Sequence, residues 1–135
     1  TSGVMLFAKN RITASKISSL FLNNQIKKFY ISVTNNKFNK NTDTLVNYNS
    51  DKKKLKLAYR KIQLGNHENC YLIKLFTGKK HQIRLQFYLN KNPIIGDKKF
   101  SGNKFNKLLL CSYKIIFKLD GKFYKFKINP NKILS

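Results

Sequence analysis

Thr77-Gly78-Lys79-Lys80-His81-Gln82-Ile83-Arg84 is the stretch that decides the fold of this chain, and it follows directly on an apolar run. A Thr-Gly turn, two lysines and an arginine meet within these eight residues. Glycine after threonine predicts a turn, because glycine adopts backbone conformations that other residues avoid. Cationic side chains at such a turn are typical of phosphate contacts, which give affinity rather than sequence choice.

The residues after this turn leave their secondary structure open. In residues 83–89 the apolar positions alternate, as in a half-buried strand. Ile83, Phe87 and Tyr88 fit one face of a helix equally well. Periodicity alone slightly favours the strand.

Two hairpins are predicted, one before the turn and one well after it. Residues 55–64 and 70–76 flank the turn signal Gly65-Asn66. Residues 113–119 and 122–128 flank Asp120-Gly121, which is the strongest hairpin signal in the chain. Pro130 then ends the ladder, because proline has no backbone N–H to donate.

The N-terminal part adds a strand, a helix and a second strand. Residues 3–8 form a continuous apolar run that predicts a buried strand. Thr13 is expected to cap a helix that ends at Asn23 and Asn24. Residues 29–33 alternate as a half-buried strand does, and residues 34–54 are interpreted as a surface loop with one short strand near 45–48. The buried face of the helix is expected to consist of Ala14, Ile17, Leu20 and Phe21.

These elements add up to one α+β unit, with a mixed, mainly antiparallel sheet and two or three helices. A chain of 135 residues is long enough for one domain with a modest core. No internal repeat and no interdomain linker interrupts it. A hydrophobic content of 41% is compatible with globular folding.

Charge is the unusual property of the composition. The chain has 28 Lys and Arg against 5 Asp and Glu, a net charge of +23. Self-repulsion of this size is relieved by an anionic partner, and basic residues spread over the whole chain suit a broad anion such as folded RNA. The alternative is an AT-rich genome that inflates lysine and asparagine at tolerant surface positions.

Cysteine and histidine usage excludes two other classes of protein. Cys70 and Cys111 are too few for a disulfide framework, and they predict buried or half-buried thiols in a reducing compartment. His67 and His81 complete no zinc spacing, so no metal is expected. No apolar run reaches the length of a membrane span. We expect a protein that is cytoplasmic or organellar, not secreted, and monomeric.

Several motifs occur in an order that resembles the RluA-type family of RNA pseudouridine synthases. The octapeptide, residues 77–84, stands where that family has Thr-Gly-Arg-Thr-His-Gln-Ile-Arg. The next motif begins with Pro93, nine residues after Arg84. The remaining matching segments are Thr1-Ser2-Gly3 with the residues that follow it, Lys28-Phe29-Tyr30, Pro93-Ile94-Ile95-Gly96-Asp97 with Phe100, and Leu110-Cys111-Ser112.

The resemblance implies the fold, the reaction and the site. The fold would be that of a pseudouridine synthase, with a helix rather than a strand after the octapeptide. The reaction would isomerise uridine to pseudouridine in ribosomal or transfer RNA without a cofactor, on a base flipped out of its stack. Tyr30 would stack near the target base and act in proton removal, and Arg84 would pair with a nucleophilic aspartate. The implied RNA-binding residues are Lys28, Thr77, Gly78, Lys79, Lys80, His81, Gln82 and Ile83.

The same resemblance places the nucleophilic aspartate three residues before the Thr of Thr-Ser-Gly, upstream of Thr1. Residues 1–135 would then be the C-terminal part of one catalytic domain that lacks its first strands and its nucleophile loop. We expect these 135 residues alone to be inactive.

Each assignment has an alternative that needs no catalysis. Tyr30 fits ordinary core packing, and Arg84 fits a phosphate contact. Asp97 fits a structural carboxylate that accepts backbone amides in a turn. The alternative for the whole chain is a catalytically inactive RNA-binding protein or ribosome-associated assembly factor that retains the fold.

Overall fold

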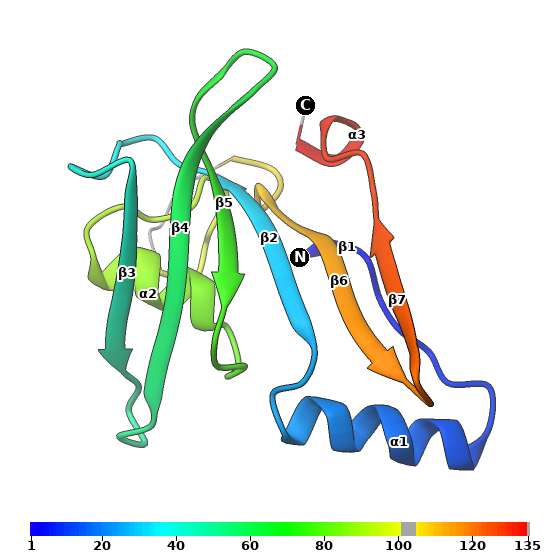
Figure 1. Ribbon diagram of the computed structural model, residues 1–135. Coiled ribbons are helices and arrows are strands. Elements are labelled where there is room, and N and C mark those ends of the chain that lie inside the picture. The colour runs from blue at the N-terminus through cyan, green and yellow to red at the C-terminus, as the bar shows by residue number, and fades with distance from the viewer. Residues whose placement is uncertain (101–104, 135) are drawn as a thin grey trace.

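The computed structural model describes residues 1–100 and 105–134, and these form a twisted seven-stranded sheet (Figure 1). The strand order is β1-β6-β2-β5-β4-β3, with β7 also paired to β6. The strands are β1 (Ser2–Gly3), β2 (Lys27–Val33), β3 (Thr42–Tyr48), β4 (Lys54–Leu64), β5 (His67–Leu75), β6 (Leu110–Leu119) and β7 (Lys122–Lys127).

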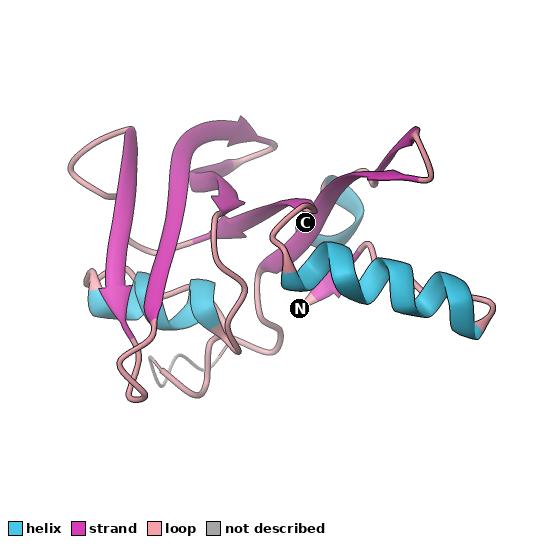
Figure 2. Ribbon diagram, turned by 60° about the horizontal axis from the view of Figure 1, so that its bottom comes forward, coloured by secondary structure: helices cyan, strands magenta, loops and turns pink. Residues whose placement is uncertain are grey.

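The described helices are α1 (Arg11–Leu22), α2 (Gln82–Leu89) and α3 (Asn131–Leu134). Figure 2 shows α1 and α2 on the same side of the sheet, which we call the α2 face. The short α3 packs through Leu134 into a cluster with Ile31, Val33 and Cys70. One face therefore carries both long helices, and the other is covered by a helix only near α3 within the described residues.

Strand β6 joins the two ends of the chain. It pairs antiparallel with β2 along one edge and with both β7 and β1 along the other, and the β1–β6 pair is parallel. Gly3 lies opposite Ser112 with a φ of 123°, and a Cβ placed there would lie 2.2 Å from the Ser112 carbonyl oxygen. Only glycine fits this contact, which explains the third residue of the Thr-Ser-Gly motif.

The main core lies between α2 and strands β3 to β5. Tyr71, Phe87 and Ile73 are fully buried there, and Leu57 is fully buried beside them. Phe38 closes the cluster, with its ring centroid 4.4 Å from that of Tyr59. The rings meet partly at their edges, the arrangement that aromatic side chains prefer.

The structure confirms the α+β fold, both hairpins and the helix after the octapeptide. The β6–β7 turn has Asp120 and Gly121 at φ values of 50° and 79°, as a two-residue hairpin turn requires. Residues 83–89 form a helix rather than a strand, because Ile83 and Phe87, one turn apart, are then both buried in the core. Cys70 and Cys111 are buried free thiols, as predicted.

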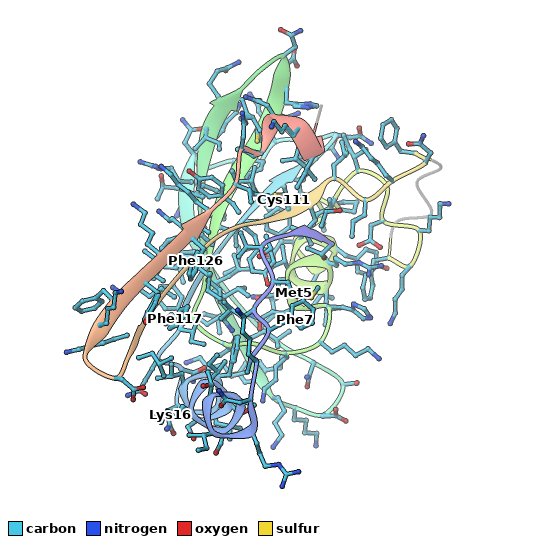
Figure 3. All side chains as sticks on the ribbon, turned by 90° about the vertical axis from the view of Figure 1, so that its right-hand side faces the viewer. Met5, Phe7, Lys16, Cys111, Phe117 and Phe126 are labelled. Atoms are coloured by element: carbon cyan, nitrogen blue, oxygen red, sulfur yellow. The ribbon has the colours of Figure 1, made fainter. Side chains whose placement is uncertain are left out.

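Three local predictions need correction. In residues 3–8 only Gly3 is in a strand, and Met5 and Phe7 are exposed (Figure 3). The short strand predicted near residues 45–48 is present but begins earlier, since β3 starts at Thr42 and all seven of its residues pair with β4. The cap of α1 is Asn10, whose side-chain oxygen accepts from the Thr13 amide at 2.8 Å, so Thr13 lies inside the helix.

The predicted buried face of α1 is also wrong. No residue of α1 is buried, and only Thr13, Ile17 and Leu20 are half-buried. Ala14 and Phe21 are exposed. The helical period of the apolar residues is confirmed, but the helix lies at the end of the sheet, where few side chains of the α2 face reach it.

Candidate active site

The octapeptide is fastened to the sheet by the amide of Gln82. Oε1 of Gln82 accepts hydrogen bonds from the Thr77 hydroxyl at 2.9 Å and from the Lys79 backbone amide at 3.1 Å. Its Nε2 donates to the Lys56 carbonyl at 3.2 Å and to Gln86 Oε1 at 3.0 Å. A buried polar side chain with all these partners fixes the turn in one conformation.

Gln86 extends this network under β3 and β4. It is fully buried, and its Nε2 lies 3.1 Å from the carbonyl oxygens of Leu45 and Leu55 and from Asn47 Oδ1. The octapeptide, α2 and two strands thus share one chain of hydrogen bonds. This chain sets the position of α2, and with it the position of Arg84.

Arg84 is in the first turn of α2 and holds Asp97 through two parallel hydrogen bonds. Its Nε lies 3.1 Å from Asp97 Oδ2, and its Nη2 lies 2.8 Å from Oδ1. Asp97 is fully buried, whereas 18% of the Arg84 side chain is exposed. Two-point pairing fixes the plane of the guanidinium group as well as its position.

Asp97 also accepts two backbone amides. Those of Lys99 and Phe100 lie 3.1 Å and 3.2 Å from its Oδ1. Burial by itself would raise the pKa of Asp97, but the Arg84 guanidinium and these two amides together lower it below its ordinary value. The structural role proposed for Asp97 is confirmed, and its pairing with Arg84 is a finding that sequence reasoning missed.

The glycine before Asp97 makes this pairing possible. Gly96 has a φ of 82°, and a Cβ placed there would lie 1.8 Å from the Lys107 carbonyl oxygen. A side chain at this position would push residues 96 and 97 away from Lys107. The Gly-Asp pair of the motif in residues 93–97 therefore delivers a carboxylate to Arg84.

Arg84 keeps donors that Asp97 does not use. A guanidinium group has five N–H donors, and Asp97 occupies the edge formed by Nε and Nη2. Nη1 lies 3.3 Å from Nδ1 of His81, the left-handed residue that precedes α2. Partial burial and the nearby charges of Arg84, Lys99 and Lys80 lower the pKa of His81, which favours its neutral form.

A pocket of about 130 Å³ opens beside Arg84. It brings Tyr30 of β2 and the octapeptide together with the first residue of the chain. Leu75 and Leu110 supply apolar walls that sequence reasoning did not single out. The lining residues are Thr1, Tyr30, Leu75, Lys79, His81, Gln82, Ile83, Arg84 and Leu110.

Tyr30 reaches the pocket beside a bulge in β6, where Tyr113 is the extra residue. The β2–β6 register shifts between Phe29 and Tyr30, so that Tyr30 lies opposite Ser112. Burial raises the pKa of Tyr30, and a hydrogen bond with Ser112 acts in the opposite direction. The phenol therefore stays protonated at neutral pH, as an aromatic wall with one hydroxyl group.

A second hollow of about 330 Å³ adjoins this pocket, since Lys79 lines both. It contains Lys28, Thr77 and Gly78. The Nζ of Lys28 lies so close to Gly78 that a Cβ on this glycine would be 2.5 Å away. Burial lowers the pKa of Lys28. Lys28 thus reaches across from β2 to the Thr-Gly turn.

The structure brings the sequence-predicted residues into one region, with different degrees of access. Lys79 and Lys80 are exposed, and His81 is half-buried. Gln82 and Ile83 are buried, and the bonds of Gln82 lie within the protein. Contact of these residues with RNA stays a prediction, whereas the positioning role of Gln82 is visible directly.

The described residues offer no cluster of three His, Cys, Asp or Glu side chains that would hold a metal ion. Among the same residues, no helix combines the length and apolar character that crossing a membrane requires. The titratable side chains that line the pocket are those of Tyr30, Lys79, His81 and Arg84.

Known proteins are similar to this chain in both sequence and fold. A sequence model of the family described as RNA pseudouridylate synthase matches residues 1–88. A protein of Mycoplasma capricolum, named as an uncharacterized RNA pseudouridine synthase, is 35% identical over 136 residues, which cover 87% of this chain and 45% of that protein. The ribosomal large subunit pseudouridine synthase C of Rickettsia prowazekii is 33% identical over 120 residues, covering 77% of this chain and 39% of that protein.

A solved structure supports the same fold. Human RNA pseudouridylate synthase domain containing 1 superposes with a TM-score of 0.75, over 90% of this chain and 61% of that one, at 15% identity. At that identity the likeness is one of fold. The chain spans less than half the length of the two bacterial relatives.

Proposed function

The chain belongs to the RNA pseudouridylate synthase family, and from that premise we propose that it forms part of an enzyme that isomerises uridine to pseudouridine within an RNA chain. In this reaction the bond from the ribose to N1 of uracil breaks, and a bond to C5 forms. The proton on C5 leaves, and N1 gains one. No cofactor enters this balance, in keeping with the family resemblance.

The observation that carries the proposal is the pocket shared by Thr1, Tyr30 and Arg84. In the family pattern the nucleophilic aspartate precedes the Thr-Ser-Gly motif by a few residues. A residue just upstream of Thr1 is within reach of this pocket, because each residue spans at most about 3.6 Å. The proposed nucleophile would therefore approach the guanidinium group of Arg84.

Arg84 has the right donors for a second carboxylate. Asp97 holds one edge of the guanidinium group, and the Nη1 side remains near His81. A nucleophilic carboxylate there would stay ionised despite its partial burial, because the fixed positive charge offsets the loss of solvent. We therefore assign Asp97 as a positioning residue for Arg84, and Arg84 as the group that orients the nucleophile.

Tyr30 would form the wall on which the flipped uracil stacks. Its protonated phenol suits stacking and hydrogen bonding, and proton removal from C5 would need a partner that takes the phenolic proton. The exposed lysines Lys79 and Lys80 would hold the flanking phosphates. Ribosomal or transfer RNA is the proposed substrate, and the name of the Rickettsia relative supports the ribosomal one.

Release of tritium from RNA labelled at C5 of uridine tests the proposal, since isomerisation frees this hydrogen. The complete gene product should release tritium, and its variant with the upstream aspartate changed to asparagine should not. Residues 1–135 alone should also be inactive while still binding RNA. Turnover by residues 1–135 would remove the need for an upstream nucleophile.

The role of Arg84 is tested by Arg84→Lys in the complete protein. Lysine keeps the positive charge beside Asp97 but lacks the planar fork, so we expect at least about a 100-fold loss of turnover, with RNA affinity within about threefold. Equal melting temperatures would show that the fold is intact. A parallel fall in turnover and affinity would instead make Arg84 a phosphate-binding residue.

A further inference from the structure

The face of the sheet opposite α2 carries a continuous lysine-rich surface. Successive residues of a strand point to opposite faces, and Tyr30, Ile73 and Leu57 pack in the core of the α2 face. Their neighbours therefore point away from α2. We call this surface the lysine face, and it consists of Lys27, Phe29, Lys56, Ala58, Lys74, Phe76, Lys114, Ile116, Lys118, Phe123, Lys125 and Lys127.

The centre of the lysine face is one row across four neighbouring strands. Phe29 lies directly opposite Lys74 on one side and Lys114 on the other. Lys114 in turn lies opposite Lys127. With strands about 4.8 Å apart, the row from Lys74 to Lys127 spans about 15 Å. An aromatic ring thus stands between cations along a line several nucleotides long.

Each phenylalanine of the lysine face has an ammonium group above its ring. Nζ of Lys114 lies 4.5 Å from the ring centroid of Phe29. Lys56 and Lys74 lie 5.1 Å and 5.3 Å from that of Phe76. Phe123 is 73% exposed, with Lys118 at 5.3 Å. Surfaces that bind single-stranded nucleic acid combine aromatic rings, on which bases stack, with cations that contact the phosphates.

The lysine face has an electrostatic cost that the described residues do not relieve. Lys114 and Lys127 are directly opposite, and like charges in that position destabilise a sheet. Partial burial lowers the pKa of Lys114, and the charges of Lys125 and Lys127 lower it further.

Acidic side chains of the strands lie elsewhere. Asp43 pairs with Tyr59, on the α2 face. Glu68 is six residues from Lys74 along β5, a distance of about 20 Å. A bound polyanion would therefore relieve a repulsion that the strands themselves leave in place.

We propose that the lysine face is a second RNA-binding surface, which holds a single-stranded segment of the substrate on the side of the sheet opposite the candidate active site. The inference rests on the proposed function for the identity of its ligand. The bases would stack on Phe29, Phe76 and Phe123, and the lysines would contact the phosphates. Binding there would add affinity without choosing the sequence, and it would leave the pocket beside Arg84 free.

Charge reversal on the lysine face is the first test. Binding of a short, fluorescein-labelled single-stranded RNA of mixed sequence to the 135-residue chain is measured by anisotropy at several salt concentrations. Lys74→Glu combined with Lys127→Glu should lower affinity at least about tenfold, and should flatten the plot of log affinity against log salt by about 0.7 for each lost contact. The control, Lys9→Glu combined with Lys61→Glu, has the same net charge and lies off the lysine face.

Thermal stability separates binding from damage to the fold in this experiment. Lys127 lies opposite Lys114, so Lys127→Glu replaces a repulsive pair with an attractive one. The melting temperature of the double variant should therefore stay the same or rise while its affinity for RNA falls. If the variant and its control lose the same affinity, total charge alone binds RNA and the proposal is overturned.

Stacking is tested by a second matched pair of variants. Phe123→Ala on the lysine face should weaken RNA binding at least about fivefold, a typical loss for one stacked base. Phe7→Ala removes a ring that is 82% exposed outside the lysine face, and it should leave affinity unchanged. Equal effects of the two would overturn the stacking role.

Failure of this inference is distinguishable from failure of the proposed function. The binding measurements need no turnover, so they hold for a protein without isomerase activity. Conversely, tritium release by the complete protein with unchanged RNA affinity in the lysine-face variants would keep the enzyme and remove the second surface.

Discussion

The two helices on the α2 face are held in opposite ways. Around α2, buried polar groups bond to one another: Gln82, Gln86 and the Arg84–Asp97 pair connect the octapeptide to β3, β4 and the segment after the helix. In α1 itself no side chain is buried, and Ile12 and Leu22 are 72% and 83% exposed. Rigid positioning is thus concentrated where the proposed chemistry needs it. In contrast, α1 is held by Leu20, which packs against Ile115 and Phe117, and by the exposed Lys16–Asp120 ion pair.

Asp97→Asn should disturb the α2 region most. It removes a charge from a buried pair and leaves the guanidinium group of Arg84 without its counterion, so we expect a loss of about 3 kcal/mol in the free energy of unfolding. Urea unfolding followed by circular dichroism measures it. A loss below about 1 kcal/mol would show that the pair contributes little and that α2 is held by its apolar side alone.

The pH dependence of stability provides a control for this variant. The pKa of Asp97 is lowered in the folded protein, so its contribution is fully present above the ordinary aspartate value of about 3.9 and is lost as the pH falls through the folded value. The difference between wild type and Asp97→Asn should therefore be constant near neutral pH and shrink in strong acid. A constant difference down to the lowest pH would exclude the charge as its cause.

Gln86→Leu should have the next largest effect. Leucine keeps the approximate size of the side chain but removes the donor to the Leu45 and Leu55 carbonyls, and it removes the acceptor for Gln82. Leaving such groups without partners costs about 1 to 3 kcal/mol. Gln63→Leu is the matched control: Gln63 is exposed, and its change should stay within about 0.5 kcal/mol.

Ile12→Ala, in α1, should have the smallest effect. Its side chain is largely exposed, so the free energy of unfolding should change by less than about 0.5 kcal/mol. Hydrogen exchange sharpens the contrast, because amides of α1 should exchange faster than those of α2. Equal protection in the two helices would mean that α1 is held as firmly as α2 and would end the comparison.

The sequence predicted the hairpins well because their signals are local. Gly65-Asn66 and Asp120-Gly121 specify turns through the conformations that their own residues accept. The helix of α2 needed more than its own residues, since its periodicity fitted a strand, and the family resemblance decided it correctly. The prediction of a buried face for α1 failed because apolar spacing shows which residues share a face but does not show what covers that face.

The same distinction applies to the candidate site. Tyr30, Arg84 and the octapeptide were predicted from motifs, and in the structure Tyr30 shares one pocket with Arg84 and four other residues of the octapeptide. The pairing of Arg84 with Asp97 was missed, although the two residues belong to successive motifs. Their contact depends on a left-handed glycine and on a close approach of Lys107, and both are properties of the tertiary structure.

The place of β6 in the sheet has a consequence for how the chain folds. The Val4 amide donates to the Ser112 carbonyl at 2.9 Å. During synthesis, this partner becomes available only after more than a hundred further residues have been added to the chain. At about 5 to 20 residues per second, the ribosome takes roughly 5 to 20 s over that stretch. The β4–β5 hairpin has its partners long before then, and the N-terminal arm should dock only once β6 has been made. Hydrogen exchange on nascent chains arrested before and well after residue 112 would detect this order as protection of the Val4 amide in the longer chains alone.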